Sequence, residues 1–317
     1  LHEPDAESRK EAPYKIEAAK DLLVFPEGKL PEGALRADEL IASMVAADLQ
    51  QINAMEPSDA NSLVHWKRVM MPSWRHNFQL QGTARTSREV SDTVLLVGKS
   101  GLEFPVRFLN RRQDARVVVV LVSDKQSGAS ETEEKELARS LGGKGYMLAT
   151  YDPYLCGARA DETLQRERKQ FDNFFTTYNR TDLQERLGEL QSIARYLRAN
   201  YPAAKIVFLG EGKAGAWVMA GAPLADAVIA DADQRNDSRD EVYLERDLFS
   251  PGWHRMGGLQ GVLALAAPNP ILLHNTGVKL RLDWIAPLYD EIGAANLARI
   301  ETGKLGPAEI TQWLEKI

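Results

Sequence analysis

Residues 205–222 have the sequence KIVFLGEGKAGAWVMAGA, and this stretch decides the fold. Its residues 206–209 are apolar and partly β-branched, which is typical of a short strand that is buried on both faces. Three glycines then mark a tight turn, and the small and apolar residues 216–222 continue as a helix. The stretch therefore predicts a strand that turns sharply into a helix.

The turn has the layout of a nucleophile elbow, whose pattern is G-x-S-x-G. Aligned with that pattern, the turn reads Gly210, Glu211, Gly212, Lys213 and Ala214, so Gly212 occupies the serine position. Glycine has no side chain that could attack a substrate. We therefore expect a degenerate elbow that lacks its nucleophile.

The same glycines also match G-x-G-x-x-G, the fingerprint of a dinucleotide site. Asp231 and Asp233 follow about 20 residues later, where a ribose-binding acid is expected. That fingerprint normally opens the first βαβ unit of its domain, whereas at least two predicted strands precede this one. A nucleotide-binding module is thus one alternative, and glycines that only let the helix pack close to the sheet are the simpler one.

Composition limits the class of protein. With 317 residues, 44% of them hydrophobic, the chain is long enough to bury a large core. A net charge of −6 and a pI of about 5.6 give no basic field, so we expect neither a nucleic acid nor a membrane as partner. Five scattered histidines and one cysteine show no metal-ligand spacing, so we expect no metal and no other cofactor. The chain begins at Leu1 without a signal-peptide pattern, and we expect it to be part of a longer polypeptide.

Residues 1–88 are expected to form an extension before the main domain. Residues 21–25 predict a short strand, and 35–55 and 63–72 predict two amphipathic helices, the second ending at the proline. We interpret this part as the tail of an upstream domain followed by a helical connector.

Three aromatic residues of the extension, Trp66, Trp74 and Phe78, allow two interpretations. They could form a platform for carbohydrate. Aromatic residues at helical spacing more often anchor a core, and we expect that role here.

From residue 89 to residue 317, strand and helix patterns alternate. Predicted strands lie at 94–96, 104–108, 117–122, 146–150, 206–209, 227–230, 270–274 and 297–301. Predicted helices lie at 131–141, 183–197, 216–222, 284–292 and 307–317. The order predicts an α/β domain at 89–317 with a doubly wound, mostly parallel sheet that begins with an antiparallel hairpin.

A long polar loop at 234–258 follows the strand 227–230 and contains Tyr243, Trp253 and His254. Open α/β sheets carry their sites in loops beyond the carboxyl ends of the strands. We therefore expect Tyr243 and Trp253 to line a binding surface together with the cleft above the elbow.

This order of elements resembles the α/β-hydrolase fold. More closely, FFTTYNR at 174–180, LGEGKAGAW at 209–217, LFSPG at 248–252 and ILLHN at 271–275 resemble the acetyl xylan esterase-like hydrolases of environmental bacteria. Some of those proteins carry two hydrolase-like domains in tandem. The resemblance implies an upstream hydrolase domain as a partner, a carbohydrate ligand and an extracytoplasmic location in a bacterium.

Carried over by position, the triad of that family fails at two places. The nucleophile falls on Gly212, and the histidine after the last strand falls in 301–305, which reads ETGKL. The acid is retained as Asp231 or Asp233. A serine hydrolase needs a nucleophile, a base and an acid, so triad hydrolysis by this chain alone is not expected.

Other residues could still serve a site. Ser127 follows an early strand, where the family keeps its oxyanion loop, and its backbone could bind an anion. His254 and His274 could pair with Asp233 as base and acid, although an isolated histidine near a strand end is more often structural. Lys213 could form a surface ion pair with Glu211 or bind a carboxylate.

Taken together, these features favour a catalytically degenerate hydrolase-like domain with a structural or ligand-binding role beside an active esterase domain. An active carbohydrate ester hydrolase with a non-standard or shared site is the first alternative. A nucleotide-binding module is the second.

Overall fold

The computed structural model describes residues 13–25, 28–80, 85–125, 136, 139–141, 144, 146–172 and 174–317. Ser127 and most of the helix predicted at 131–141 lie outside these residues. Two compact units divide the chain, residues 1–47 and residues 48–317. In the described part, no helix combines the length and the hydropathy that a bilayer crossing requires.

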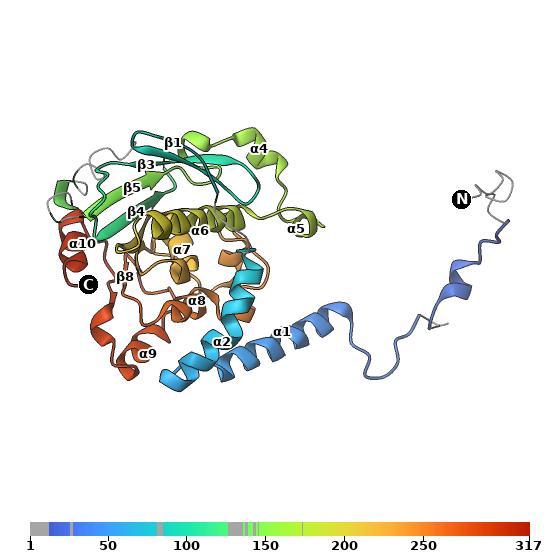
Figure 1. The fold of residues 1–317 in the computed structure, drawn as a ribbon. Coiled ribbons are helices and arrows are strands. Elements are labelled where there is room, and N and C mark those ends of the chain that lie inside the picture. Colours follow the sequence, from blue (N-terminus) through green and yellow to red (C-terminus); the bar gives the residue numbers. More distant parts are fainter. Residues whose placement is uncertain are drawn as a thin grey trace, which may run out of the picture. The chain divides into compact units, whose positions relative to one another are not determined.

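One sheet organises the larger unit (Figure 1). The described residues form nine strands: β1 Arg85–Val90, β2 Thr93–Val97, β3 Glu103–Phe108, β4 Val117–Ser123, β5 Tyr146–Tyr151, β6 Lys205–Glu211, β7 Ala227–Asp231, β8 Ile271–His274 and β9 Ala298–Ile300. Their order in the sheet is β1-β2-β3-β5-β4-β6-β7-β8-β9. The pairs β1/β2, β2/β3 and β3/β5 are antiparallel, and the remaining pairs are parallel. The predicted parallel sheet with an antiparallel start is confirmed.

Helices cover both faces of this sheet. The described α-helices are α1 Ala37–Ala54, α2 Ala60–Asn77, α4 Glu162–Glu167, α5 Phe175–Tyr178, α6 Asp182–Asn200, α7 Ala214–Ala220, α8 Gly258–Ala266, α9 Ile285–Glu291 and α10 Pro307–Leu314. Alternate residues of β4 point to opposite faces because the side chains of a strand repeat every two residues. Val118 and Val120 join a core with α2, α6, α7, α8 and α9, whereas Val119 and Leu121 join a core with α10.

The helix α2 is longer than the sequence predicts, because it continues through Pro72 to Asn77. The two tryptophans on its buried face explain this continuation. The indole Nε1 of Trp66 donates to the carbonyl of Gly261 at 3.0 Å, and that of Trp74 donates to the carbonyl of Ala220 at 2.9 Å. Both rings are buried, so their predicted role as core anchors is confirmed. This packing outweighs the single backbone hydrogen bond that a proline removes.

Three expectations about elements were wrong or incomplete. Residues 21–25 form no strand; a 3-10 helix, η2, covers Ala19–Leu22, and its side chains are exposed. The polar edge strand β1 was missed because it is exposed along its whole length and shows no apolar alternation. The helix α8, all of whose residues are buried, was also missed.

The contacts divide the chain between residues 47 and 48, and the boundary expected at 88/89 stays a prediction. Both α2 and β1 belong to the compact unit 48–317, together with the whole sheet. The unit 1–47 contains η2 and the first part of α1.

A close approach between α7 and the end of β7 fixes the elbow. A Cβ added to Gly215 would overlap the backbone carbonyl oxygen of Asp231. A Cβ added to Gly210 would lie 2.6 Å from the carbonyl oxygen of Ala214. Close packing is therefore a sufficient reason for glycine at both positions. This agrees with the simpler interpretation of the motif, in which the glycines only let the helix pack close to the sheet.

We predict that Gly215→Ala destabilises the chain by about 3 kcal/mol or more, because the atom it meets is backbone and cannot rotate away. Gly303→Ala is the matched control, since no heavy atom lies within 4 Å of its added Cβ and its φ is not positive. Urea unfolding followed by tryptophan fluorescence measures both. Equal midpoints for the two variants would contradict the close approach.

Candidate functional site

The turn after β6 retains the backbone of a nucleophile elbow but presents no nucleophile. Gly212 has a φ of +56°, the left-handed conformation that such a turn requires. A Cβ at this position would lie 3.1 Å from Oδ1 of Asp124, which follows β4. A carboxylate thus faces the place where a serine hydroxyl would stand.

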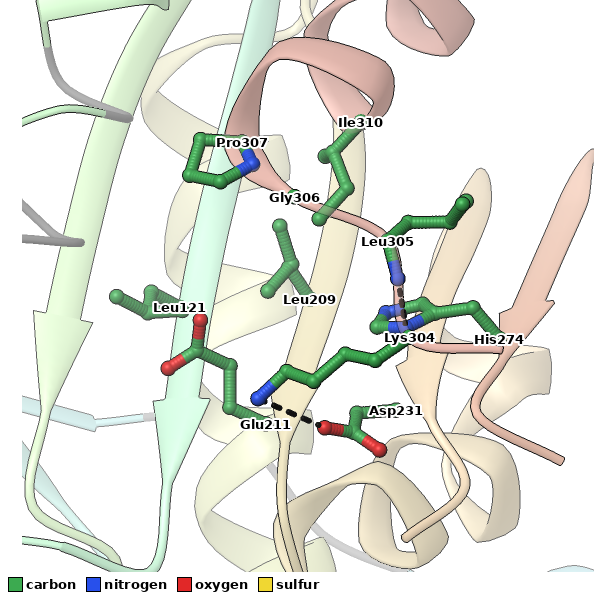
Figure 2. Close-up of a pocket in the computed structure, with 10 residues that line it drawn as sticks. All are labelled: Leu121, Leu209, Glu211, Asp231, His274, Lys304, Leu305, Gly306, Pro307 and Ile310. Carbon is green, nitrogen blue, oxygen red and sulfur yellow. Dashed lines mark hydrogen bonds and ion pairs between the residues drawn. The ribbon is translucent and has the colours of Figure 1, made fainter. Parts of the chain in front are cut away.

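Asp231, at the end of β7, is the centre of the polar contacts beside this turn. Its Oδ1 accepts hydrogen bonds from Nδ2 of Asn275 at 2.7 Å and from the backbone N–H of Asp233 at 2.8 Å. Its Oδ2 lies 3.4 Å from Nζ of Lys304 (Figure 2). Burial favours the neutral acid, but the two hydrogen bonds and the charge of Lys304 outweigh it and lower the pKa of Asp231. Asp231 is therefore an ionised carboxylate.

His274 lies at the end of β8, opposite Asp231 in the register of the two strands. The residue is only 3% exposed, and its Nδ1 accepts a hydrogen bond from the backbone N–H of Leu305 at 3.3 Å (Figure 2). Burial lowers the pKa of His274 below its ordinary value, and the nearby carboxylate of Asp231 opposes this only in part. The imidazole is accordingly neutral and holds the turn that carries Lys304.

Two adjoining cavities surround these groups. The first has a volume of about 340 Å³ and lies between the ends of β4, β6 and β7 and the start of α10. The second has a volume of about 260 Å³ and lies above Gly212. Both are lined by Glu211, Asp231 and Lys304, so these three side chains stand at their junction.

The chemistry that these cavities offer is acid–base and ionic. The one hydroxyl among their described lining residues belongs to Ser123, and its Oγ accepts a hydrogen bond from the backbone N–H of Lys125 at 3.2 Å. His274 lines only the other cavity, so no histidine lines the cavity of this serine. Among the described residues, no three His, Cys, Asp or Glu side chains are grouped so as to hold a metal ion.

The structure brings together some of the residues that the sequence singled out. Gly210, Glu211 and Gly212 form the elbow, and Asp231 and His274 lie beside it. Asp233 lines the cavity above Gly212. Lys213 pairs with Asp247 at 3.1 Å, and not with Glu211, which was one of its two possible roles.

Tyr243, Trp253 and His254 lie elsewhere. Tyr243 and Trp253 are only 4% and 2% exposed, and their rings pack against each other at 5.1 Å between centroids. The aromatic binding surface expected from them is wrong, because both rings belong to the core under the loop. His254 faces Asp240, with Nε2 3.5 Å from Oδ1, and pairs with neither Asp233 nor Asp231.

Sequence reasoning missed Lys304, Asn275 and Asp124 as members of the site. Lys304 lies in the stretch 301–305, where the family's histidine is expected, and Asn275 directly follows β8. A search for any polar side chain at those two positions would have found both. Asp124 has no such signal, since only the fold brings the end of β4 to Gly212.

Acidification should weaken the chain through His274. Its folded pKa lies below the ordinary value of 6.5, so the unfolded chain binds a proton first as the pH falls. The stability it contributes is present above pH 6.5 and is lost as the pH falls through the folded pKa. NMR titration of the ring protons should place the midpoint of His274 below 6.5, with His274→Gln identifying the signal. A midpoint above 6.5 would contradict the neutral, buried imidazole.

No protein-family model matches the sequence, and no curated protein matches it. Solved structures do match. A protein from Bacteroides fragilis named as an acetyl xylan esterase has 12% identity and a TM-score of 0.56, with 88% of this chain aligned to 84% of that chain. A methylesterase has 12% identity and a TM-score of 0.57, with 87% of this chain aligned to 68% of that chain.

A third similar structure is a glucuronoyl esterase of carbohydrate esterase family 15 from Caldicellulosiruptor kristjansonii. It has 11% identity and a TM-score of 0.51, with 78% of this chain aligned to 85% of that chain. At such identities the likeness concerns the fold. Together with the order of the strands and the elbow after β6, it shows that this chain has an α/β-hydrolase fold similar to that of the acetyl xylan esterases.

Proposed function

We propose that this chain is a hydrolase-fold domain that has lost triad hydrolysis and serves as a ligand-binding or structural domain beside an active esterase domain of the same polypeptide. One observation carries the proposal. Gly212 stands at the nucleophile position, and the stretch 301–305, where the base is expected, offers Lys304, whose amine lies 3.4 Å from the carboxylate of Asp231. A lysine paired in this way is a cation without a free lone pair, so it cannot accept a proton from a nucleophile.

The carboxylate of Asp124 supports the same conclusion. Acyl transfer needs hydrogen-bond donors where negative charge develops on the substrate oxygen. Here Oδ1 of Asp124 lies 3.1 Å from the Cβ position at Gly212, so a negative group faces the reacting centre. Like charges this close would raise the energy of a tetrahedral intermediate rather than lower it.

A carbohydrate ligand for the cleft is part of the proposal. Similar structures are named as an acetyl xylan esterase, a methylesterase and a glucuronoyl esterase. The lining of the two cavities offers carboxylates from Glu211 and Asp231 and an ammonium group from Lys304. The hydroxyl groups of a sugar can donate hydrogen bonds to the carboxylates and accept them from the ammonium group, so this lining suits a carbohydrate.

An active ester hydrolase with a non-standard site remains the alternative, since His274 and Asp231 are a buried histidine and a carboxylate on adjacent strands. In a triad, however, the acid accepts a hydrogen bond from the Nδ1–H group of the histidine. Here Nδ1 of His274 is itself an acceptor, from the backbone of Leu305. The nucleotide alternative rests on the glycine spacing and on Asp231 or Asp233 as a ribose-binding acid. Close packing is a sufficient reason for the glycines, and Asp231 is held by Asn275, Lys304 and the backbone of Asp233.

The first test is the release of acetate from acetylated xylan. We expect the parent chain to release acetate no faster than buffer. Two engineered variants are then compared. The first carries Gly212→Ser and Asp124→Asn, and the second carries these two substitutions together with Lys304→His. The added base should raise the rate at least tenfold, because a positioned general base contributes roughly 10²–10⁴-fold.

Release by the parent chain above the buffer rate would overturn the proposed loss of hydrolysis. If the parent is active, His274→Ala tests the alternative, which requires that activity to disappear. Equal rates for the two engineered variants would contradict the assignment of Lys304 to the histidine position.

Calorimetry with acetylated xylo-oligosaccharides tests the ligand-binding part. We expect heat with the parent chain and binding weakened about tenfold by Lys304→Met, which removes a charged hydrogen-bond donor from the cleft. His65→Gln, an exposed change on α2, is the control for a surface substitution. The absence of heat with the parent would leave only the structural role.

A further inference from the structure

A third cavity, of about 500 Å³, adjoins the cavity of about 260 Å³ above Gly212. Lys213 and Asp233 line both of them. Lys213 directly follows Gly212 in the elbow, and Asp233 comes two residues after the end of β7. The two cavities therefore meet at the carboxyl edge of the sheet, where open α/β sheets bind their ligands.

The backbone at this junction has an uncommon conformation. Asp233 has a φ of 51° and Gln234 a φ of 49°, in the left-handed region that residues with a side chain rarely adopt. Two hydrogen bonds hold the turn: the N–H of Asp233 donates to Oδ1 of Asp231 at 2.8 Å, and that of Gln234 donates to the carbonyl of Asn275 at 2.8 Å. Backbone strain is concentrated at functional sites, and here it falls on a residue that lines both cavities.

The third cavity is open to solvent and polar. All of its described lining residues except Val242 are at least partly exposed. The side chains of Arg239 and Glu241, which belong to this lining, are each 71% exposed. Protein interfaces are centred on apolar or aromatic anchors, and the described lining offers no exposed side chain of that kind. A polar ligand therefore fits this cavity better than a protein surface.

The charges of the third cavity are balanced. Its described lining carries three cations and three carboxylates, from Lys213, Arg235, Arg239, Asp233, Glu241 and Glu245. Arg235 pairs with Glu245 at 2.8 Å, and Arg239 faces Glu241 at 3.7 Å. Balanced charges attract neither a polyanion nor a polycation, but they form strong hydrogen bonds with hydroxyl groups. A neutral ligand rich in hydroxyl groups is therefore favoured.

A further cavity, of about 470 Å³, also reaches Lys213 but is less open. Its lining includes Leu155, Cys156, Arg186 and Trp217, all of which are at most 7% exposed. The cavity of about 500 Å³ is therefore the accessible continuation of the elbow.

The volume of the third cavity sets the length of the ligand. Pockets for one small molecule have volumes of about 300–1,000 Å³, so this cavity alone has room for such a ligand. A ligand that fills it together with the cavity above Gly212 is longer than a single sugar ring.

We propose that the cavity above Gly212 and the third cavity form one groove that binds a chain of several linked, neutral sugars. One end of the chain lies beside Gly212, and the other lies against Arg239 and Glu241. This inference rests on the ligand-binding part of the proposed function and adds that the carbohydrate is a chain.

Calorimetry on the parent chain, at constant ionic strength, compares acetylated xylobiose, acetylated xylohexaose and hexagalacturonate. The hexaose should bind at least tenfold more tightly than the biose, because only the hexaose reaches the third cavity. This is more than the repetition of one disaccharide along the chain can give. Hexagalacturonate should bind more weakly than the hexaose, because the groove has no positive field for its carboxylates.

A charge-neutral pair of substitutions assigns the gain to the third cavity. Arg239→Gln with Glu241→Gln should weaken the hexaose severalfold and leave the affinity for the biose unchanged. Both side chains are largely exposed, so the fold should not be affected. Arg112→Gln with Asp114→Asn is the matched control, since it removes an exposed ion pair before the start of β4. The control should change neither affinity.

The outcomes separate the groove from the proposed function. Heat with both sugars but equal affinity for them would overturn the groove and leave ligand binding at the elbow intact. Unchanged hexaose affinity in the variant of Arg239 and Glu241, or tighter binding of hexagalacturonate than of the hexaose, would also overturn the groove. The absence of heat with every sugar would refute the ligand-binding part of the proposed function, and the groove with it.

Discussion

The contact between α7 and the end of β7 is the constraint on which the candidate site depends. With no Cβ at Gly215, the helix can lie against the carbonyl of Asp231. That position sets the left-handed turn at Gly212 beside Asp231, with Lys304 on the other side of the carboxylate. The turn thus has the backbone geometry of an elbow, although Gly212 carries no side chain. Steric demands of the backbone do not by themselves fix which side chains a site carries.

The same fold buries an unusual amount of charge along α6. Its apolar face packs on the sheet as expected, but its polar face is buried as well, with Asp182, Glu185 and Glu189 almost inaccessible. Each of these acids has an arginine partner: Arg168 with Asp182 at 3.0 Å, Arg180 with Glu185 at 3.3 Å and Arg159 with Glu189 at 2.7 Å. Burial raises the pKa of Glu189 to about 7 even beside its arginine. Such pairs add little net stability, but they fix the segments that cover the helix, among them the one that carries Gln170.

Sequence reasoning predicted the elements that a local pattern specifies. It failed where contacts with residues far away in the chain determine the structure. The strands with apolar runs, the helix α6 and the elbow were all predicted, because period and glycine spacing are local properties. The proline in α2 was misjudged because the two tryptophans that hold the helix together contact residues more than 140 positions away. Tyr243 and Trp253 were misplaced for a similar reason. A loop rich in aromatic residues has the same sequence whether its rings face solvent or a core.

By itself, the sequence determined the alternation of strands and helices and the absence of a nucleophile at Gly212, since both follow from the identity of residues close together in the chain. Only the tertiary structure decided that Lys304 pairs with Asp231, that Asp124 faces the elbow and that the buried Asp182 pairs with both Arg168 and Arg246. These groups come from different loops, which meet because parallel strands bring their carboxyl ends to one edge of the sheet. The length and path of each loop then determine which side chains come into contact, and a local sequence pattern does not predict them.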